Sequence, residues 1–161
     1  MPEELGSQRE IVRVAYFLIS ACVVIFDQVT KYLVVSKITL GKTVPLISGI
    51  FHITLVLNNG IAFGLCDNNI CVPIAVSFFV IVAIFVFLIR YPGKKRFLIN
   101  FGLSLILGGC VSNLIDRLRL GNVIDFLDFR IWPVFNVADS AISVGTFLLL
   151  LGAFKKHKVE K

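Results

Sequence analysis

Histidine is scarce in this chain, and its scarcity limits the chemistry that the protein can perform. Of 161 residues only His52 and His157 are histidines, and no H-E-x-x-H motif occurs, which excludes a zinc protease of that type. No C-x-x-C pair or His/Cys cluster occurs either. The serine of segment 102–105 lies in an apolar run, and no such run supplies a histidine to activate it. We therefore expect no metal ion and no other cofactor.

Internal repeats, low-complexity stretches and basic patches interleaved with aromatic residues are also absent. What the chain has in excess is apolar residues, which make up 57% of it and give a mean hydropathy of +0.91. A soluble domain of this length has no interior large enough to bury so much apolar surface. The composition therefore predicts a single integral membrane domain over residues 1–161.

Four apolar runs are as long as the roughly 20 residues that cross a bilayer. The first run is too long for the apolar core of a signal peptide and lacks a small-x-small cleavage site, so we interpret it as a retained span. The expected fold is a membrane all-α protein with four transmembrane helices and a small extracytoplasmic β part. The predicted spans are residues 14–35, 70–89, 97–115 and 134–154.

Lysine and arginine are unevenly distributed around these runs. The segments before the first run, between the second and third, and after the fourth hold ten basic and four acidic residues. The whole formal charge of +6 therefore lies on one side of the membrane. Because loops rich in lysine and arginine remain in the cytoplasm, both termini are predicted to be cytoplasmic. The positive charge reflects membrane topology, and we expect no nucleic-acid partner.

The two remaining segments, 36–69 and 116–133, are predicted to be extracytoplasmic. In the second, Trp132 has the position of an interface anchor. The first contains alternating apolar residues followed by Asn59-Gly60, which predicts a strand and a turn of a small sheet at the outer membrane surface. The alternating residues are Phe51, Ile53, Leu55 and Leu57.

Six polar residues are expected together at the outer end of the spans. A charged side chain at the centre of a bilayer costs about 2.5–3.5 kcal/mol on insertion scales, and such residues usually face a bundle interior or a water-filled cavity. The inner halves of the spans contain no comparable set, which places a candidate site at the outer leaflet. The six are Asp27, Asn113, Arg117, Asp139, Asn136 and, in the loop just before the fourth span, Asp125.

Four of these residues, and the nearby Arg119 and Asp128, also have a purely structural interpretation. Asp27 and Lys31 are four residues apart and would form a pair at the helix surface that reaches toward the interface. Asn136 has the position of an N-cap for the fourth helix. The other structural interpretations are a helix–helix hydrogen bond for Asn113, interfacial anchors for Arg117 and Arg119, and a solvated loop charge for Asp128.

Asp125 and Asp139 together indicate a reaction. Two carboxyl groups at one site cannot both ionise cheaply, so one retains its proton and the pair titrates as a unit. The ionised member can take a proton from water, and the protonated member can donate to a carbonyl oxygen. This division of labour is that of an aspartic protease, and it needs neither a metal nor a covalent intermediate.

Four sequence blocks resemble lipoprotein signal peptidase, the bacterial signal peptidase II family. They are FDQVTKYLV, NNGIAFG, GGCVSNLIDRLRLGNVIDFLDF and FNVADSAISVG, in the family's order, and the resemblance covers about residues 14 to 154. It implies an intramembrane aspartyl endopeptidase of the bacterial inner membrane with its active site at the extracytoplasmic face. The implied substrate is a diacylglyceryl-modified prolipoprotein, cut just before the lipidated cysteine.

The resemblance also implies roles for individual residues. Asp125 and Asp139 match the family's catalytic pair, and segment 36–69 matches its substrate-cupping β-cradle. Membrane lipids and the cyclic peptide inhibitor globomycin are the other implied ligands. Because one chain supplies both aspartates, we expect a monomer. The residues that match the family's supporting positions are Asp27, Asn58, Asn113, Arg117 and Asn136.

Two points in the outer segments stay open. Ile61 replaces the small residue of the family's N-x-G-A-A-F pattern, which bears on cradle packing and substrate preference. The doubled asparagine leaves a choice between Asn58 and Asn59, for which the spacing to the glycine favours Asn58. A disulfide between Cys66 and Cys71 is compatible with an oxidising compartment but is not required.

Two other classes of protein compete with the peptidase. A small proton-coupled transporter or channel subunit would use Asp27 and Asp139 as a proton path, but it should have polar residues through both leaflets, and the inner halves are nearly unbroken apolar sequence. A non-enzymatic assembly subunit would use its polar residues only to join helices, and its Asp139→Asn variant would work normally.

Overall fold

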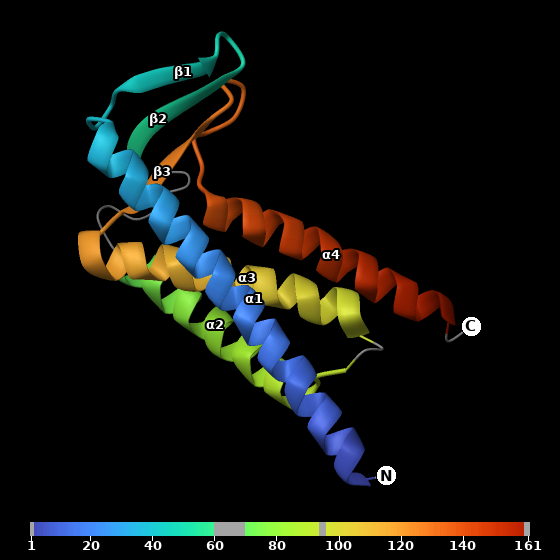
Figure 1. The fold of residues 1–161 in the computed structure, drawn as a ribbon. Helices are drawn as coiled ribbons and strands as arrows, with labels where there is room; N and C mark the ends of the chain where they lie inside the picture. Colours follow the sequence, from blue (N-terminus) through green and yellow to red (C-terminus); the bar gives the residue numbers. More distant parts are fainter. Residues whose placement is uncertain (1, 60–69, 94–95, 160–161) are drawn as a thin grey trace.

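The computed structural model describes residues 2–59, 70–93 and 96–159. Figure 1 shows a helical body with a small sheet beyond one end, and both termini at the other end of the helical body. The elements, in chain order, are α1 (Pro2–Lys37), β1 (Thr43–Ile47), β2 (Phe51–Asn58), α2 (Cys71–Arg90), α3 (Phe97–Leu120), β3 (Val123–Asp128) and α4 (Val137–Val159).

Within the described ranges, three helices are long and apolar enough to cross a membrane. They are α2, α3 and residues Val137–Lys155 of α4, each of which contains a stretch with a mean hydropathy of 1.8 or more. They correspond to the predicted spans 70–89, 97–115 and 134–154. All four apolar runs are helical, as expected, but α1 is not among these three, so a membrane crossing by residues 14–35 stays a prediction.

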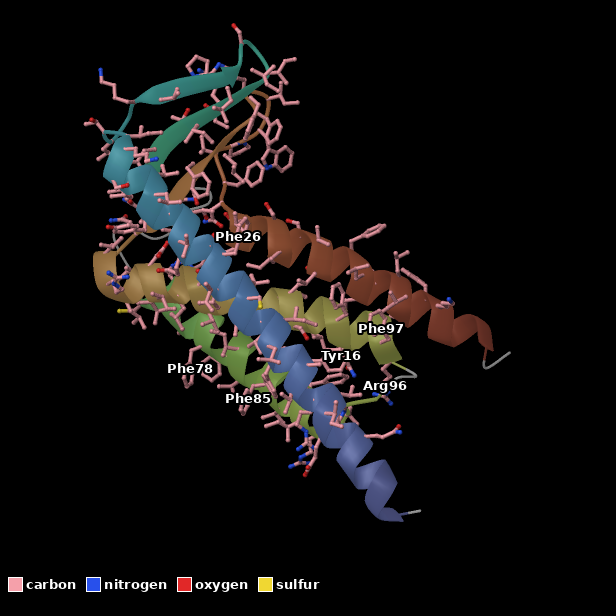
Figure 2. All side chains as sticks on the ribbon, viewed as in Figure 1. Tyr16, Phe26, Phe78, Phe85, Arg96 and Phe97 are labelled. Carbon is pink, nitrogen blue, oxygen red and sulfur yellow. The ribbon has the colours of Figure 1, made fainter. Side chains whose placement is uncertain are left out.

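Helix α3 lies at the centre of the helical body and packs against α1, α2 and α4. Its contact with α4 is close because glycines face backbone: a Cβ on Gly109 would lie 2.5 Å from the carbonyl oxygen of Ala138. Outward-facing residues are apolar; Phe78 on α2, for example, is 56% exposed and projects away from the body (Figure 2). Small residues between helices and large apolar residues outside are typical of helices that pack within lipid.

The sheet is antiparallel in the order β1-β2-β3. The predicted strand is confirmed as β2, but its apolar alternation does not give one buried face. His52 and Leu55 are buried, whereas Leu57 is 40% exposed. A register shift in the pairing with β3, between Ile53 and Val56, changes which side chains face inward.

Strand β3 lies where a loop was expected. Gly121, with a φ of 78°, ends α3 and donates its N–H to the carbonyl oxygen of Arg117 at 3.0 Å, after which the chain enters the sheet. Val123, Ile124 and Phe126 are buried, so this segment is stabilised as a strand that is covered on both faces. The interpretation of Asp125 as a loop residue is therefore wrong.

Asp128 at the end of β3 is buried, so the prediction of a solvated loop charge is also wrong. Its carboxylate accepts hydrogen bonds from the Thr54 hydroxyl at 2.6 Å and from the Arg130 N–H at 2.8 Å. These donors, Thr54 above all, lower the pKa of Asp128. The apolar sequence around Asp128 carries it into the sheet, where neighbouring donors compensate for its burial.

Three sequence predictions concern residues outside the described ranges. The glycine of the Asn-Gly turn, the substitution at Ile61 and the Cys66 end of the proposed disulfide all lie in segment 60–69.

Candidate active site

Asp125 lies in the middle of β3 with 1% of its surface exposed. Its Oδ1 accepts a hydrogen bond from Nδ2 of Asn136 at 2.7 Å, and its Oδ2 accepts one from Nδ2 of Asn58 at 2.9 Å. Asn58 is the last residue of β2, the strand next to β3. The sheet thus holds one face of this carboxyl group, while the residue that precedes α4 holds the other.

Asp139 lies in the first turn of α4. Its Oδ1 accepts a hydrogen bond from Nδ2 of Asn113 on α3 at 2.8 Å, and its Oδ2 accepts one from the backbone N–H of Asn136 at 3.3 Å. The carboxyl group is therefore held between α3 and the start of its own helix.

Asn136 connects the two aspartates. Its Oδ1 accepts the backbone N–H of Asp139 at 2.8 Å, so it is the N-cap of α4, and the reciprocal bond to the Asp139 carboxyl completes a capping box. Because Oδ1 is committed to the cap, Nδ2 must point the other way, toward Asp125. The N-cap predicted for Asn136 is therefore confirmed, and the same amide also reaches the carboxyl group of Asp125. A supporting role in catalysis stays a prediction.

Within the described part of the chain, each of the four carboxyl oxygens of this pair accepts one N–H hydrogen bond, and none of these donors carries a charge. Burial raises the pKa of Asp125 to about 6; the charge of Asp139 also raises it, whereas the hydrogen bonds from Asn58 and Asn136 and the charge of Lys31 lower it. A carboxyl group with this pKa carries a proton over a pH range in which an ordinary aspartate is ionised. The arrangement therefore suits a pair that shares one proton.

Beneath the pair lies a buried charge cluster, of which the sequence analysis identified Asp27 and Lys31 but not Asp116. Lys31 Nζ lies 2.7 Å from Oδ2 of Asp27, 2.7 Å from Oδ2 of Asp116 and 3.0 Å from Oδ1 of Asn113. Lys31 and Asp27 do pair, as their spacing predicts, but both are fully buried between helices, so the expected surface pair is wrong. The N-x-x-D spacing from Asn113 to Asp116, about one helical turn, is the signal that would have added Asp116 to the site.

The two acids of this cluster also hold the backbone beside the catalytic candidates. Asp27 Oδ1 accepts the N–H of Ala138 at 2.8 Å, and Asp116 Oδ2 accepts the N–H of Ile124 at 3.2 Å. Ala138 and Ile124 are the residues directly before the two aspartates of the pair. Through one backbone contact each, the cluster fixes where α4 begins and where β3 passes.

The remaining predicted residues differ in how closely they approach the pair. Asn58, rather than its exposed neighbour Asn59, bonds to Asp125, in agreement with the spacing argument. Among the described residues, Arg117 donates from Nη1 to the backbone oxygen of Asn113 at 3.5 Å, and no hydrogen bond from Arg117 to the neighbouring loop supports the expected role in holding it. Arg119 is exposed, which fits an interfacial anchor.

Comparison with known proteins gives the family. The sequence matches the profile of signal peptidase (SPase) II over residues 19–155. It is 46% identical to a lipoprotein signal peptidase of Brevibacillus brevis over 145 residues, which are 89% of this chain and 97% of the relative. The chain belongs to the signal peptidase II family. A second lipoprotein signal peptidase, from Nostoc punctiforme, is 46% identical over 147 residues, 87% of this chain and 90% of its own.

The fold has solved counterparts as well. Two structures of bacterial membrane enzymes superpose with TM-scores of 0.81 and 0.79 at 31% identity, covering 91% and 88% of this chain and 92% and 93% of theirs. Together with the three apolar helices, this makes the signal peptidase II chain a multi-pass membrane protein. Among the described residues, no group of three or more His, Cys, Asp and Glu side chains has the arrangement of a metal site.

Proposed function

We propose that this protein is an aspartyl endopeptidase whose catalytic residues are Asp125 and Asp139. It removes the signal peptide from diacylglyceryl-modified prolipoproteins by cutting just before the lipidated cysteine. The observation that carries the proposal is the shared environment of the two carboxyl groups: both are bound by Asn136, and all four of their oxygens accept N–H donors. Family membership supports the peptidase activity and the processing of lipoproteins.

The pair holds one proton in the resting state, because two adjacent ionised carboxylates repel each other in a buried site. The ionised carboxylate removes a proton from a water molecule, and the oxygen of that water attacks the scissile carbonyl carbon. The protonated member donates its proton to the carbonyl oxygen, which gives a neutral tetrahedral diol. The first carboxyl group then gives the proton that it took from water to the amide nitrogen, while the second takes a proton back from a diol hydroxyl. The C–N bond breaks, the amine leaves and a carboxylic acid forms, and one proton is again held by the pair.

The membrane explains the depth of the site. The acyl chains of the substrate remain in the bilayer, so its scissile bond lies near the membrane surface. We propose that the chain has four spans, α1 included, with both termini cytoplasmic, so that the start of α4 and the sheet lie at the extracytoplasmic face of the inner membrane. The uneven distribution of lysine and arginine supports this orientation, and so does the position of both termini at the end away from the sheet (Figure 1).

A proton path through the membrane is less well supported. The inner half does contain buried polar groups, contrary to the expectation of nearly unbroken apolar sequence: the Ser20 hydroxyl bonds the carbonyl oxygen of Ser104 at 2.8 Å, and Asn100 Nδ2 bonds that of Tyr91 at 3.1 Å. These groups do not ionise near neutral pH. The buried aspartates and the buried lysine of the described chain all lie toward the sheet, which favours one-sided chemistry over transport.

The proposal is tested with purified protein in detergent and three substrates. A diacylglyceryl-modified prolipoprotein should be cut, and mass spectrometry of the released peptide should place the cut before the modified cysteine. The same prolipoprotein without the lipid should stay intact. A prolipoprotein whose cysteine has been moved to another position should also stay intact. Globomycin should abolish cleavage, and the active species should elute as a monomer. If the lipidated substrate remains uncut by a well-folded enzyme, the proposed function is wrong.

A further inference from the structure

Lys31 has its hydrogen-bonding capacity filled by three oxygen atoms. An ammonium group has three N–H donors and no acceptor, and Nζ lies at 2.7, 2.7 and 3.0 Å from oxygens of Asp27, Asp116 and Asn113. Lys31 is 1% exposed, so water does not compete for these positions. The geometry leaves one partner for each N–H.

The third of these bonds determines the orientation of an amide. Because the ammonium cannot accept a hydrogen bond, Asn113 must turn its oxygen toward Lys31, and its NH2 group must then point toward Asp139, to which it donates at 2.8 Å. Asn136 Nδ2 approaches the same Asn113 oxygen at 3.1 Å and favours the same orientation. A reversed amide would place NH2 against an ammonium and an oxygen against a carboxyl oxygen.

We propose that Lys31 is a positioning residue for peptide cleavage, acting through Asn113 to present an N–H donor to Asp139. The proposal rests on the function proposed above and adds a role for a residue remote from the reacting atoms. The pairing with Asp27 and Asp116 alone would need only two of the three N–H groups. The third connects the charge cluster to the catalytic pair.

Charge adds to the effect of geometry. Asp27, Asp116 and Lys31 together carry a net charge of about −1 when ionised, and the positive charge of Lys31 lowers the pKa of Asp125. Among the described residues, the other ionisable groups that face this region are Asp125 on β3, Asp139 on α4, Arg117 on α3, one turn from Asn113, and Cys110 on α3, which interacts electrostatically with Asp139. Removing the ammonium therefore disturbs both the amide and the proton balance of the pair.

A double-mutant cycle between Lys31 and Asn113 tests the inference. Single-turnover cleavage of the lipidated prolipoprotein is measured for wild type, Lys31→Met, Asn113→Ala and the double variant, with folding checked by thermal unfolding in detergent. We expect Lys31→Met to slow cleavage about 100-fold, the size of a misplaced catalytic group, with little change in KM. In the Asn113→Ala background the same substitution should change the rate by less than about threefold. Equal losses in both backgrounds would refute the proposal.

Lys31→Met leaves two buried acids without their cation and can fail to fold for that reason. A second comparison tests the role of Lys31 in that case. Asp27→Asn combined with Lys31→Met keeps the net charge of the cluster, and it is compared with Asp27→Asn alone. The combined variant should be about 100-fold slower; equal rates would overturn the role of Lys31. A wild-type enzyme that fails to cut the substrate would refute the proposed function, and the role of Lys31 with it, whereas cutting by wild type and by a well-folded Lys31→Met alike would refute only the latter.

Discussion

Asn136 and Asp139 hold each other at the first turn of α4, the asparagine oxygen on the Asp139 N–H at 2.8 Å and the Asp139 carboxyl on the Asn136 N–H at 3.3 Å. This arrangement fixes the direction of the Asn136 amide, whose NH2 group then reaches Asp125 at 2.7 Å. The N-cap of α4 therefore also determines how the carboxyl group of Asp139 on α4 lies relative to that of Asp125 on β3.

Two substitutions at Asn136 separate the cap from the link to Asp125. Serine is as good an N-cap as asparagine but has no NH2 group to reach across, and alanine provides neither. We expect Asn136→Ser, which retains the cap, to melt at a higher temperature than Asn136→Ala but to lose about 100-fold in rate relative to wild type. Asn136→Ala should lose both stability and rate, as measured by thermal unfolding and cleavage. An Asn136→Ser enzyme with wild-type activity would show that the link has no catalytic value.

Gly109 sets the distance between α3 and the start of α4. A methyl group at this position would lie 2.5 Å from the Ala138 carbonyl oxygen, which belongs to the residue before Asp139. Gly109→Ala must therefore push α4 away, and we expect a lower melting temperature together with at least about a tenfold loss of rate. Gly93→Ala is the matched control, since nothing lies within 4 Å of its added carbon. Equal behaviour of the two variants would contradict the close approach.

In the proposed mechanism, the pH dependence of cleavage reports on Asp125. Asn58 donates to its carboxylate, a contact that favours the ionised form and lowers the pKa. Removal of this donor by Asn58→Ala should raise the pKa of Asp125 above its value of about 6, so the limb of the pH–rate profile that Asp125 governs should move to higher pH. Asn59→Ala, at the exposed neighbour, should leave the profile unchanged. A shift to lower pH in Asn58→Ala would contradict this account.

The same pKa predicts a cost in stability. Burial raises the pKa of Asp125 from 3.8 to about 6, so the folded state binds this proton more tightly than the unfolded state. The stabilisation from the proton is fully present below about pH 4 and is lost as the pH rises through about 6. Asp125→Asn, which is neutral at every pH, should gain in melting temperature relative to wild type between pH 4 and 7. A difference that does not change with pH would argue against a raised pKa.

Much of the fold was predictable from short stretches of sequence. The length of an apolar run relative to the bilayer thickness predicts a spanning helix, and alternation of apolar and polar residues predicts a strand. The four helical runs and strand β2 follow from such local rules. Strand β3 did not, since its stability depends on pairing with β2, nearly seventy residues earlier, and on burial of Val123 and Phe126. The residues of β2 that face inward were predicted wrongly for a related reason. A register shift is a property of two paired strands, so the sequence of one strand does not reveal it.

The site was predictable as a set of residues but not as a network. The unusual position of polar groups in apolar runs indicated Asp27, Asn113, Asn136 and Asp139. Lys31 was underestimated, because an i,i+4 pair with an acid is ordinary on an exposed helix. The structure was needed to show that α3 covers the Asp27–Lys31 pair and supplies Asp116 as a second acid for Lys31.

The most direct test of the central claim compares wild type with Asp125→Asn and Asp139→Asn on one lipidated prolipoprotein. Asparagine nearly preserves the shape of each side chain but cannot exchange the shared proton. If the two carboxyl groups form the catalytic pair, wild type cuts the substrate and both folded variants leave it intact over the whole pH range. Cleavage by either variant at a rate near that of wild type would contradict the account.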